Sequence, residues 1–192
     1  VWQAMGGMQV GSIWGHGSYV APDWTADYLH REAVFILNNW ANSEFGAANY
    51  ESLTSEQKAV LRQRLQDTVR KNNYDAATQK LTLEPIRAAA FEDNLKHYSE
   101  IFTNGNKDYA IQRDAQSDPV KLRQMNAFFF WTAWASAANR PDNTISYTSN
   151  FPHEPLVGNT PTDSAIVWTG ESVMLLLASI GWLVWVYAGK KM

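Results

Sequence analysis

The most constraining feature of this sequence is an apolar stretch near its C-terminus. Residues 165–188 read AIVWTGESVMLLLASIGWLVWVYA, and Glu171 is the one formally charged residue among these 24. A helix needs about 20 apolar residues to cross the hydrocarbon core of a bilayer. Aromatic residues gather toward the two ends, as in the interfacial belts of membrane helices, at Trp168, Trp182, Trp185 and Tyr187. The stretch therefore predicts one transmembrane helix, which we favour over a buried core helix of a soluble protein.

Two lysines, Lys190 and Lys191, directly follow the apolar stretch. Because the cytoplasmic flanks of membrane helices are enriched in Lys and Arg, we expect this end on the cytoplasmic side. Residues 1–163 are then predicted to form an extracytoplasmic domain. Residues 164–192 are predicted to comprise the transmembrane helix and the start of a cytoplasmic segment, with bilayer lipid as a partner.

The composition excludes several classes of function. A formal net charge of −3 does not suit nucleic acid as a partner, because binding to phosphate needs a basic face. The chain has no cysteine, which excludes disulfides, thiolate metal sites and a c-type haem attached through Cys-x-x-Cys-His. The sequence contains no carboxylate pair, catalytic triad or nucleophile elbow, so we expect no catalytic residue in this segment.

Residues 1–163 show the apolar periodicity of helices. A first helix is expected after Thr25, which is a suitable N-cap. A capping box, Thr54-x-x-Gln57, begins a second, and Pro85 and Pro119 suit the first turns of two more. The apolar faces of the first two helices are Leu29, Ala33, Ile36, Leu37, Trp40, Val60, Leu61, Leu65 and Val69. The prediction is an all-α domain.

Residues 144–161 are rich in Pro, Asn and Thr and lack a helical pattern. Their aromatic side chains need burial, so we expect an ordered loop that leads to the membrane helix. The run Thr144–Thr148 also fits a short strand. Within the loop, His153 and Glu154 are assigned to packing in preference to proton delivery, and His30 on the first helix is assigned a structural role.

The most distinctive local motif is residues 11–31, GSIWGHGSYVAPDWTADYLHR. Glycines at positions 6, 7, 11, 15 and 17 indicate tight turns or close approach of the backbone to another group. The spacing and the Lys of a phosphate-binding P-loop are absent. The segment Gly15–Tyr19 brings together carbonyl and phenol oxygens, which are hard ligands suited to a cation such as Ca²⁺.

Two long segments, Trp2–Glu32 and Phe128–Thr162, together with the apolar helix, resemble single-chain, quinol-dependent nitric oxide reductases. The middle, residues 45–120, is similar in helical pattern and length. The resemblance implies a cytochrome c-like domain that packs on a membrane core of the same chain in a bacterial inner membrane, with residues 1–163 in the periplasm. That core holds haem b, a high-spin haem and a non-haem iron, and it reduces two NO to N2O and water with electrons from quinol. Whether the enzyme is a homo-oligomer stays open.

In the cytochrome-bearing relatives, a haem-attachment segment precedes Gly-Glu-Gly-Ala-Tyr and an Ala-Pro pair. Residues Gly15–Tyr19 and 21–22 match these two motifs. The two haem-binding cysteines then fall on Gly7 and Val10, and the haem-ligating histidine falls on Gly11. All three ligands are absent, so the resemblance implies a cytochrome c-like scaffold without its haem.

The same resemblance implies a calcium ion between the glycine loop and the propionates of the core haems. The ligands from this domain are the backbone carbonyl of Gly17 and the phenol of Tyr19. A core glutamate and the propionates supply the others. Because Ca²⁺ takes six to eight oxygens, we expect the isolated domain to bind it weakly or not at all. His16, where the family has an acidic residue, is a candidate contact to a haem propionate.

Some features of the chain allow other interpretations. The aromatic cluster at residues 128–134 is predicted to be core that fills the space of the missing haem, which an open cavity would contradict. A different class of function is a free-standing, membrane-anchored periplasmic binding or sensor module, distinguished by the reading frame beyond residue 192. A third is an electron-transfer protein with a non-covalent haem, which a Soret band would reveal. Glu171 is given no function.

Overall fold

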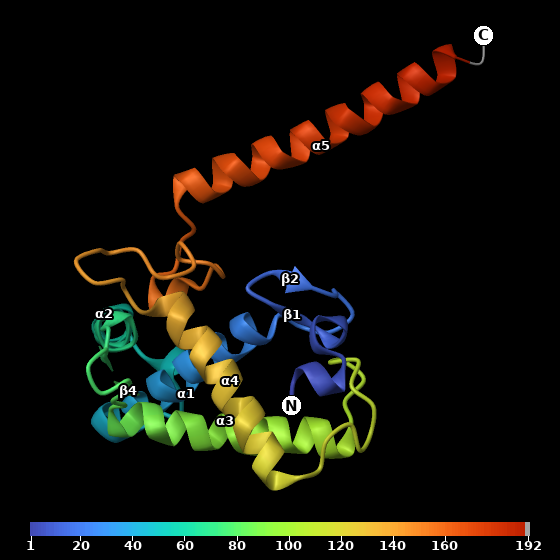
Figure 1. Cartoon of the computed structure of the whole chain (residues 1–192). Coiled ribbons are helices and arrows are strands. Elements are labelled where there is room, and N and C mark those ends of the chain that lie inside the picture. Colours follow the sequence, from blue (N-terminus) through green and yellow to red (C-terminus); the bar gives the residue numbers. More distant parts are fainter. Residues whose placement is uncertain (191–192) are drawn as a thin grey trace. The chain divides into compact units, whose positions relative to one another are not determined.

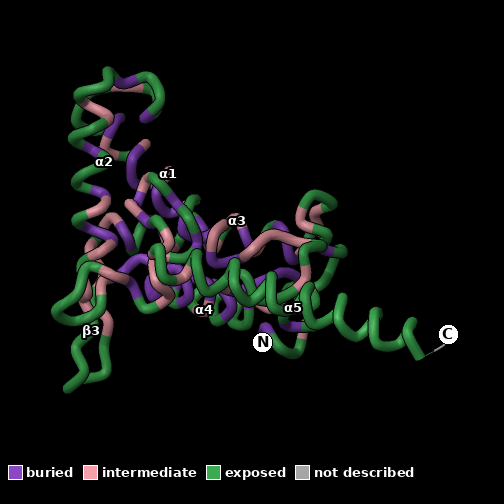
Figure 2. The backbone as a smooth tube through the Cα atoms, turned by 90° about the horizontal axis from the view of Figure 1, so that it is seen from above, coloured by how far each residue is buried: buried purple, intermediate pink, exposed green. Residues whose placement is uncertain are grey.

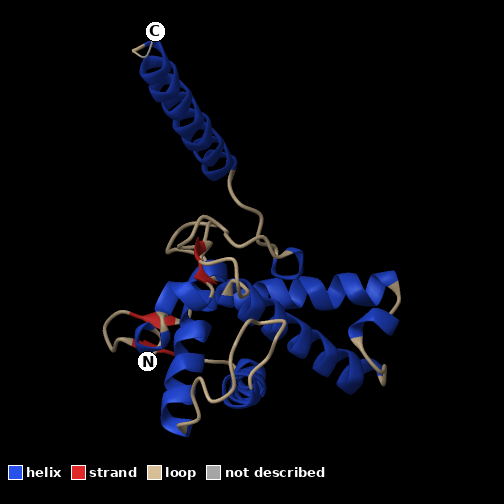
Figure 3. Cartoon of the chain, turned by 90° about the vertical axis from the view of Figure 1, so that its right-hand side faces the viewer, coloured by secondary structure: helices blue, strands red, loops and turns tan. Residues whose placement is uncertain are grey.

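The computed structural model describes residues 1–190 and divides them into two units, Val1–Thr160 and a second that starts at Pro161. The structure is predominantly helical, as Figures 1 and 3 show. The α-helices are α1 (Trp24–Phe45), α2 (Ser55–Arg70), α3 (Pro85–Asn104), α4 (Pro119–Ala137) and, in the second unit, α5 (Asp163–Gly189). The predicted all-α class is confirmed.

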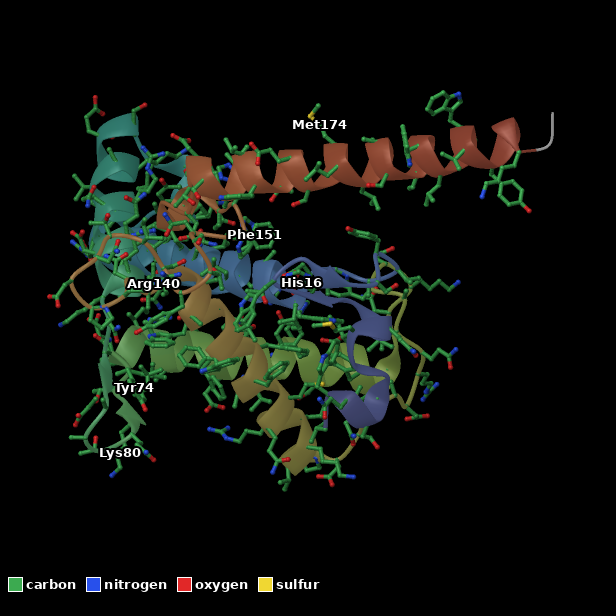
Figure 4. All side chains as sticks on the ribbon, turned by 45° about the horizontal axis from the view of Figure 1, so that its top comes forward. His16, Tyr74, Lys80, Arg140, Phe151 and Met174 are labelled. Atoms are coloured by element: carbon green, nitrogen blue, oxygen red, sulfur yellow. The ribbon has the colours of Figure 1, made fainter. Side chains whose placement is uncertain are left out.

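Short elements connect these helices. Two antiparallel hairpins, one before α1 and one between α2 and α3, contain the strands β1 (Ser12–Ile13), β2 (His16–Gly17), β3 (Tyr74–Asp75) and β4 (Lys80–Leu81). Single 3₁₀ turns are η1 (Gln3–Met5), η2 (Gly7–Val10), η3 (Tyr50–Ser52) and η4 (Pro155–Val157). Figure 4 shows Tyr74 and Lys80 on the second hairpin, which projects from the helices.

Local signals placed three helix starts correctly. Thr54 and Gln57 form the predicted capping box of α2, and Pro85 and Pro119 each occupy the first turn of a helix. The predicted N-cap of α1 was wrong. Asp23 caps this helix by accepting a hydrogen bond from the Ala26 N–H at 2.9 Å.

The core of the first unit lies where α1, α3 and α4 pack together, which Figure 2 shows as the buried part of the tube. The predicted inner face of α1 is confirmed, because four of its five positions are fully buried: Leu29, Ala33, Ile36 and Leu37. For α2 the prediction was too broad. Val60 is exposed, since this outer helix contributes only a narrow stripe consisting of Leu61, Leu65 and Val69.

A buried ion pair joins α1 to α3. The Arg87 guanidinium donates to Glu32 from Nε at 2.7 Å and from Nη2 at 3.2 Å, and both side chains are excluded from solvent. Burial by itself would lower the pKa of Arg87, but the attraction of Glu32 outweighs it and leaves that pKa raised. Hydropathy patterns do not predict this ion pair, because it places two charged residues on helix faces that are otherwise apolar.

The loop that follows α4 is held by one side chain from α2. Arg70 donates to the carbonyl oxygens of Thr144 at 2.7 Å and Gly158 at 3.2 Å, and to the side chains of Asn150 and Asn159. The loop is therefore ordered, as predicted. The alternative of a strand over residues 144–148 was wrong: this stretch contains one isolated bridge, between Ser146 and Asn139. Several of its backbone groups bond instead to side chains, as the Ser146 N–H does to the Asn150 amide oxygen at 2.9 Å.

In the second unit, α5 is a continuous helix of 27 residues, which corresponds to about 40 Å. Its length and composition suffice to cross a membrane. The hydroxyls of Thr169, Ser172 and Ser179 donate to carbonyl oxygens four residues earlier, so the helix satisfies these polar groups internally. Lys190 caps the helix, whereas Lys191, used to predict its orientation, lies outside the described residues.

Candidate functional site

The glycine-rich segment folds into a small hairpin that Asp23 braces. One carboxylate oxygen of Asp23 accepts hydrogen bonds from the Gly15 N–H at 2.7 Å and the Ser12 hydroxyl at 2.8 Å, while the other caps α1. The hairpin pairs Ser12 with Gly17. The glycine loop, defined here as residues 11–20, is thus tied directly to the first turn of α1.

Gly17 occupies a position that only glycine tolerates. Its φ is +143°, and a Cβ there would lie 2.5 Å from the Gly11 carbonyl oxygen and 2.9 Å from that of Met8. The adjacent Ser18 N–H donates to the same Met8 oxygen at 2.7 Å. These contacts hold Gly17 against Ser12 on the second strand of the hairpin, whose turn is formed by Trp14 and Gly15.

The three predicted site residues lie on the second strand of the hairpin or just after it. His16, Gly17 and Tyr19 are exposed, and 93 % of the Tyr19 side chain is accessible. Phe151, from the loop after α4, approaches the turn of the hairpin, because a Cβ on Gly15 would come within 2.9 Å of its ring. Figure 4 shows His16 and Phe151 on these two neighbouring loops. The glycine loop therefore presents its backbone and one phenol outward.

Beneath the loop, the position aligned with the haem-ligating histidine has no room for a side chain. Gly11 has a φ of +129°, and a Cβ there would lie 2.2 Å from the indole nitrogen of Trp24. That nitrogen donates to the Val10 carbonyl at 3.0 Å. The indole of a fully buried tryptophan thus fills the space beside Gly11 and is fixed there by its hydrogen bond to the Val10 carbonyl.

Other aromatic rings pack around this indole. Phe129 stacks on Trp24 with ring centroids 5.1 Å apart and planes within 3°, and Trp2 approaches both rings edge-on at 6.0 and 5.4 Å. Phe129 and Phe130 are buried, as predicted for residues 128–134. Trp131, in the same cluster, is 49 % exposed, so its assignment to the core was wrong. It lies on the outer face of α4 and packs on Trp14.

Comparison with known families identifies the domain. Residues 1–153 match the family described as the cytochrome c-like domain of the NorB subunit of nitric oxide reductase. The chain belongs to this family. No curated protein matches it. The match covers both the glycine loop and the helical region for which the sequence offered only a pattern of helices.

In this cytochrome c-like domain, His30 and Glu154 interact with each other. The His30 Nδ1 and a Glu154 carboxylate oxygen are 2.7 Å apart, which ties the loop after α4 to α1. The other Glu154 oxygen accepts from the Leu156 N–H at 3.0 Å. The buried Glu154 thus packs the loop, while His153 points to solvent.

Sequence reasoning missed Asp23 as the brace of the glycine loop and Trp24 as the residue beside Gly11. Asp23 did carry a signal, because a carboxylate directly before a helix is a strong N-cap candidate. For Trp24 no local signal exists, since its partner is defined by tertiary contact.

No cluster of three or more His, Cys, Asp or Glu side chains suited to a metal ion occurs within residues 1–190 of this nitric oxide reductase domain. The calcium ligands assigned by resemblance, Gly17 and Tyr19, are of the oxygen class that Ca²⁺ prefers. Two oxygens are far fewer than that ion takes. The glycine loop alone therefore does not supply a complete calcium site.

Proposed function

We propose that this chain is the non-catalytic N-terminal part of a membrane-bound, quinol-dependent nitric oxide reductase. Residues 1–163 lie on the periplasmic side and pack on the haem-bearing core of the same chain, and residues 164–192 cross the bacterial inner membrane. The observation that carries the proposal is the indole of Trp24 at the haem-ligand position Gly11, below an intact glycine loop.

A cytochrome subunit both carries a haem and packs on the membrane core. This arrangement keeps the second role without the first. The haem-ligand position is closed by packing, and the chain lacks the cysteines of a covalent haem, which supports a donor other than a cytochrome. Quinol, delivered to the core from the bilayer, fits that requirement. The glycine loop keeps its braced geometry, which supports its use as a docking element.

The role of the docking element is to hold the bridging calcium of the core. The Gly17 carbonyl and the Tyr19 phenol supply two oxygens, and His16 contacts a haem propionate. A bound calcium would offset the negative charge of the propionates and link the two modules. Asp23 supports these groups from below, because it fixes the Gly15 N–H and the Ser12 hydroxyl.

The test uses the full-length protein, purified from membranes. Tyr19→Phe removes the phenol oxygen from the exposed part of the glycine loop and keeps the aromatic ring. We expect calcium affinity to fall by about tenfold or more, because one ligand or strong hydrogen bond contributes at least about 1.4 kcal/mol. NO consumption should fall with it and recover at high calcium. Tyr74→Phe, an exposed tyrosine on the second hairpin, is the matched control.

Unchanged calcium affinity in Tyr19→Phe would contradict the shared calcium site. The wider proposal fails if the full-length protein carries no haem and consumes no NO. A reading frame that continues into a signalling domain after residue 192 would instead support a membrane-anchored sensor.

A further inference from the structure

Two tyrosines share one carboxylate near the start of α1. The Tyr98 hydroxyl donates to Asp27 Oδ2 at 2.7 Å, and the Tyr109 hydroxyl donates to Asp27 Oδ1 at 2.9 Å. Tyr98 is fully buried, whereas Tyr109 is half-buried. Burial, followed by the charge of Asp27, raises the pKa of Tyr109 to about 12 and that of Tyr98 well above its usual value. Both phenols therefore keep their protons, and each has a base in hydrogen-bond contact.

Trp24 lies directly against this pair. Its ring centroid is 5.9 Å from that of Tyr98 and 5.7 Å from that of Tyr109, and Trp2 follows at 6.0 Å. Oxidisable rings thus lead from the partly exposed Tyr109, and from Trp2, to the buried Tyr98. The indole N–H of Trp24 donates to a backbone carbonyl, which is too weak a base to accept its proton.

We propose that Tyr98 and Asp27 form a one-electron redox site, and that Trp24 relays oxidising equivalents to it. The oxidant would be a strong one-electron acceptor from solution, of the class of the nitrogen dioxide radical. Trp24 gives one electron to this radical, which becomes nitrite. Tyr98 then returns an electron to the Trp24 radical cation, its O–H bond breaks, and the proton passes to the Asp27 carboxylate. The products are a neutral tyrosyl radical, a neutral carboxylic acid and restored Trp24.

The proton acceptor selects which residue is oxidised, and the shorter of the two hydrogen bonds to Asp27, 2.7 Å from Tyr98 against 2.9 Å from Tyr109, favours Tyr98. An oxidised phenol is a strong acid, so its formation is favoured where a base lies within about 2.6–3.2 Å. Tyr28 provides the contrast inside the same core. It is fully buried and its ring lies 6.1 Å from Tyr98, but among the described residues its hydroxyl has no carboxylate partner. The same oxidant should therefore leave Tyr28 unchanged.

The experiment uses residues 1–192 in detergent micelles, with photo-oxidised tris(bipyridine)ruthenium as the oxidant. Freeze-quench EPR, with ring-deuterated tyrosine for assignment, measures the radical. We expect a tyrosyl signal in the wild type and its loss in Tyr98→Phe. In Asp27→Asn, which keeps the shape of the side chain, the yield should fall by about tenfold or more, because general bases contribute at least that factor. Tyr28→Phe is the matched control and should leave the signal unchanged.

Circular dichroism checks that each variant is folded. If Tyr98→Phe does not fold, the wild type still tests the proposal, because transfer of the phenolic proton to Asp27 should make tyrosyl formation slower in D2O than in H2O. A signal that persists in folded Tyr98→Phe, an equal loss in Tyr28→Phe, or a formation rate unchanged in D2O would each overturn the proposal.

Discussion

Replacing Gly11 with alanine tests whether tryptophan packing has closed the haem-ligand position. A Cβ at residue 11 would lie 2.2 Å from the indole nitrogen of Trp24 and 2.8 Å from the Pro22 carbonyl oxygen. Neither neighbour can move easily. Trp24 is fully buried and stacked on Phe129, and the Pro22 carbonyl accepts a hydrogen bond from the Ser12 N–H at 3.2 Å.

The magnitude is the sum of three costs. Holding a non-glycine residue at the φ of +129° found at Gly11 costs about 1–3 kcal/mol. Displacing the buried indole adds about 1–3 kcal/mol of overpacking. Losing the hydrogen bond from Trp24 to Val10 adds about 1 kcal/mol. We expect Gly11→Ala to lower the free energy of unfolding by about 3–7 kcal/mol, which is a large part of the stability of a typical domain.

Urea unfolding followed by tryptophan fluorescence measures this difference in the full chain in detergent. Gly7→Ala is the matched control from the same segment. Gly7 also has a positive φ, +54°, but a Cβ there would meet nothing within 4 Å, so its cost is limited to about 1 kcal/mol of backbone strain. A loss of stability in Gly11→Ala that does not exceed that of Gly7→Ala would refute the argument.

The same geometry predicts what happens when the haem-attachment motif is put back by mutation. The triple variant Gly7→Cys, Val10→Cys and Gly11→His recreates the haem-attachment pattern in sequence. Produced in a host that attaches c-type haem, it should show no Soret band, because the Trp24 indole still occupies the ligand position. Stoichiometric covalent haem in this variant would contradict that expectation.

Three further predictions concern the brace, the buried ion pair and alkaline pH. Asp23→Asn should destabilise the domain by about 1–2 kcal/mol and speed hydrogen exchange at Gly15, because an amide nitrogen cannot accept the two donors that meet one carboxylate oxygen. Exchange unchanged at Gly15 would count against the brace. Glu32→Gln should lower the free energy of unfolding in urea by about 3 kcal/mol, because it leaves the buried Arg87 charge uncompensated; a loss below about 1 kcal/mol would disagree. The contribution of the buried phenols to stability should be constant up to about pH 10 and then fall, since the unfolded chain loses its phenolic protons first when the folded pKa is raised, as for Tyr98. Urea midpoints should show this fall and a shallower one in Tyr98→Phe.

The helix starts show which features of the fold can be predicted from the sequence. Thr54, Pro85 and Pro119 begin helices because capping and proline geometry depend on neighbours within one turn. The start of α1 was predicted wrongly at Thr25, although Asp23 is an equally good N-cap residue. Tertiary structure resolves it: the Asp23 carboxylate also binds the glycine loop, and the Thr25 hydroxyl faces Thr132 on α4 at 3.2 Å.

In the candidate site as well, some residues could be predicted from the sequence and others could not. The glycine spacing pointed to the segment Gly15–Tyr19, because positive φ and close backbone approach leave a mark in residue type. Within it, Gly17 and Tyr19 were chosen by resemblance to the family. Asp23 and Glu154 act through partners elsewhere in the chain, and for Glu154 that partner, His30, is 124 residues away. Such contacts leave no local periodicity, so a single sequence does not display them.

By itself, the sequence determined that the chain carries no covalent haem and contains one helix long and apolar enough to cross a membrane. These properties follow from residue types and from the length of an apolar run. Only the tertiary structure decided that the Trp24 indole lies against Gly11 and that Glu32 and Arg87 pair inside the core. The reason is physical: these outcomes depend on which helix faces meet and how their side chains share a volume, and local patterns do not specify that.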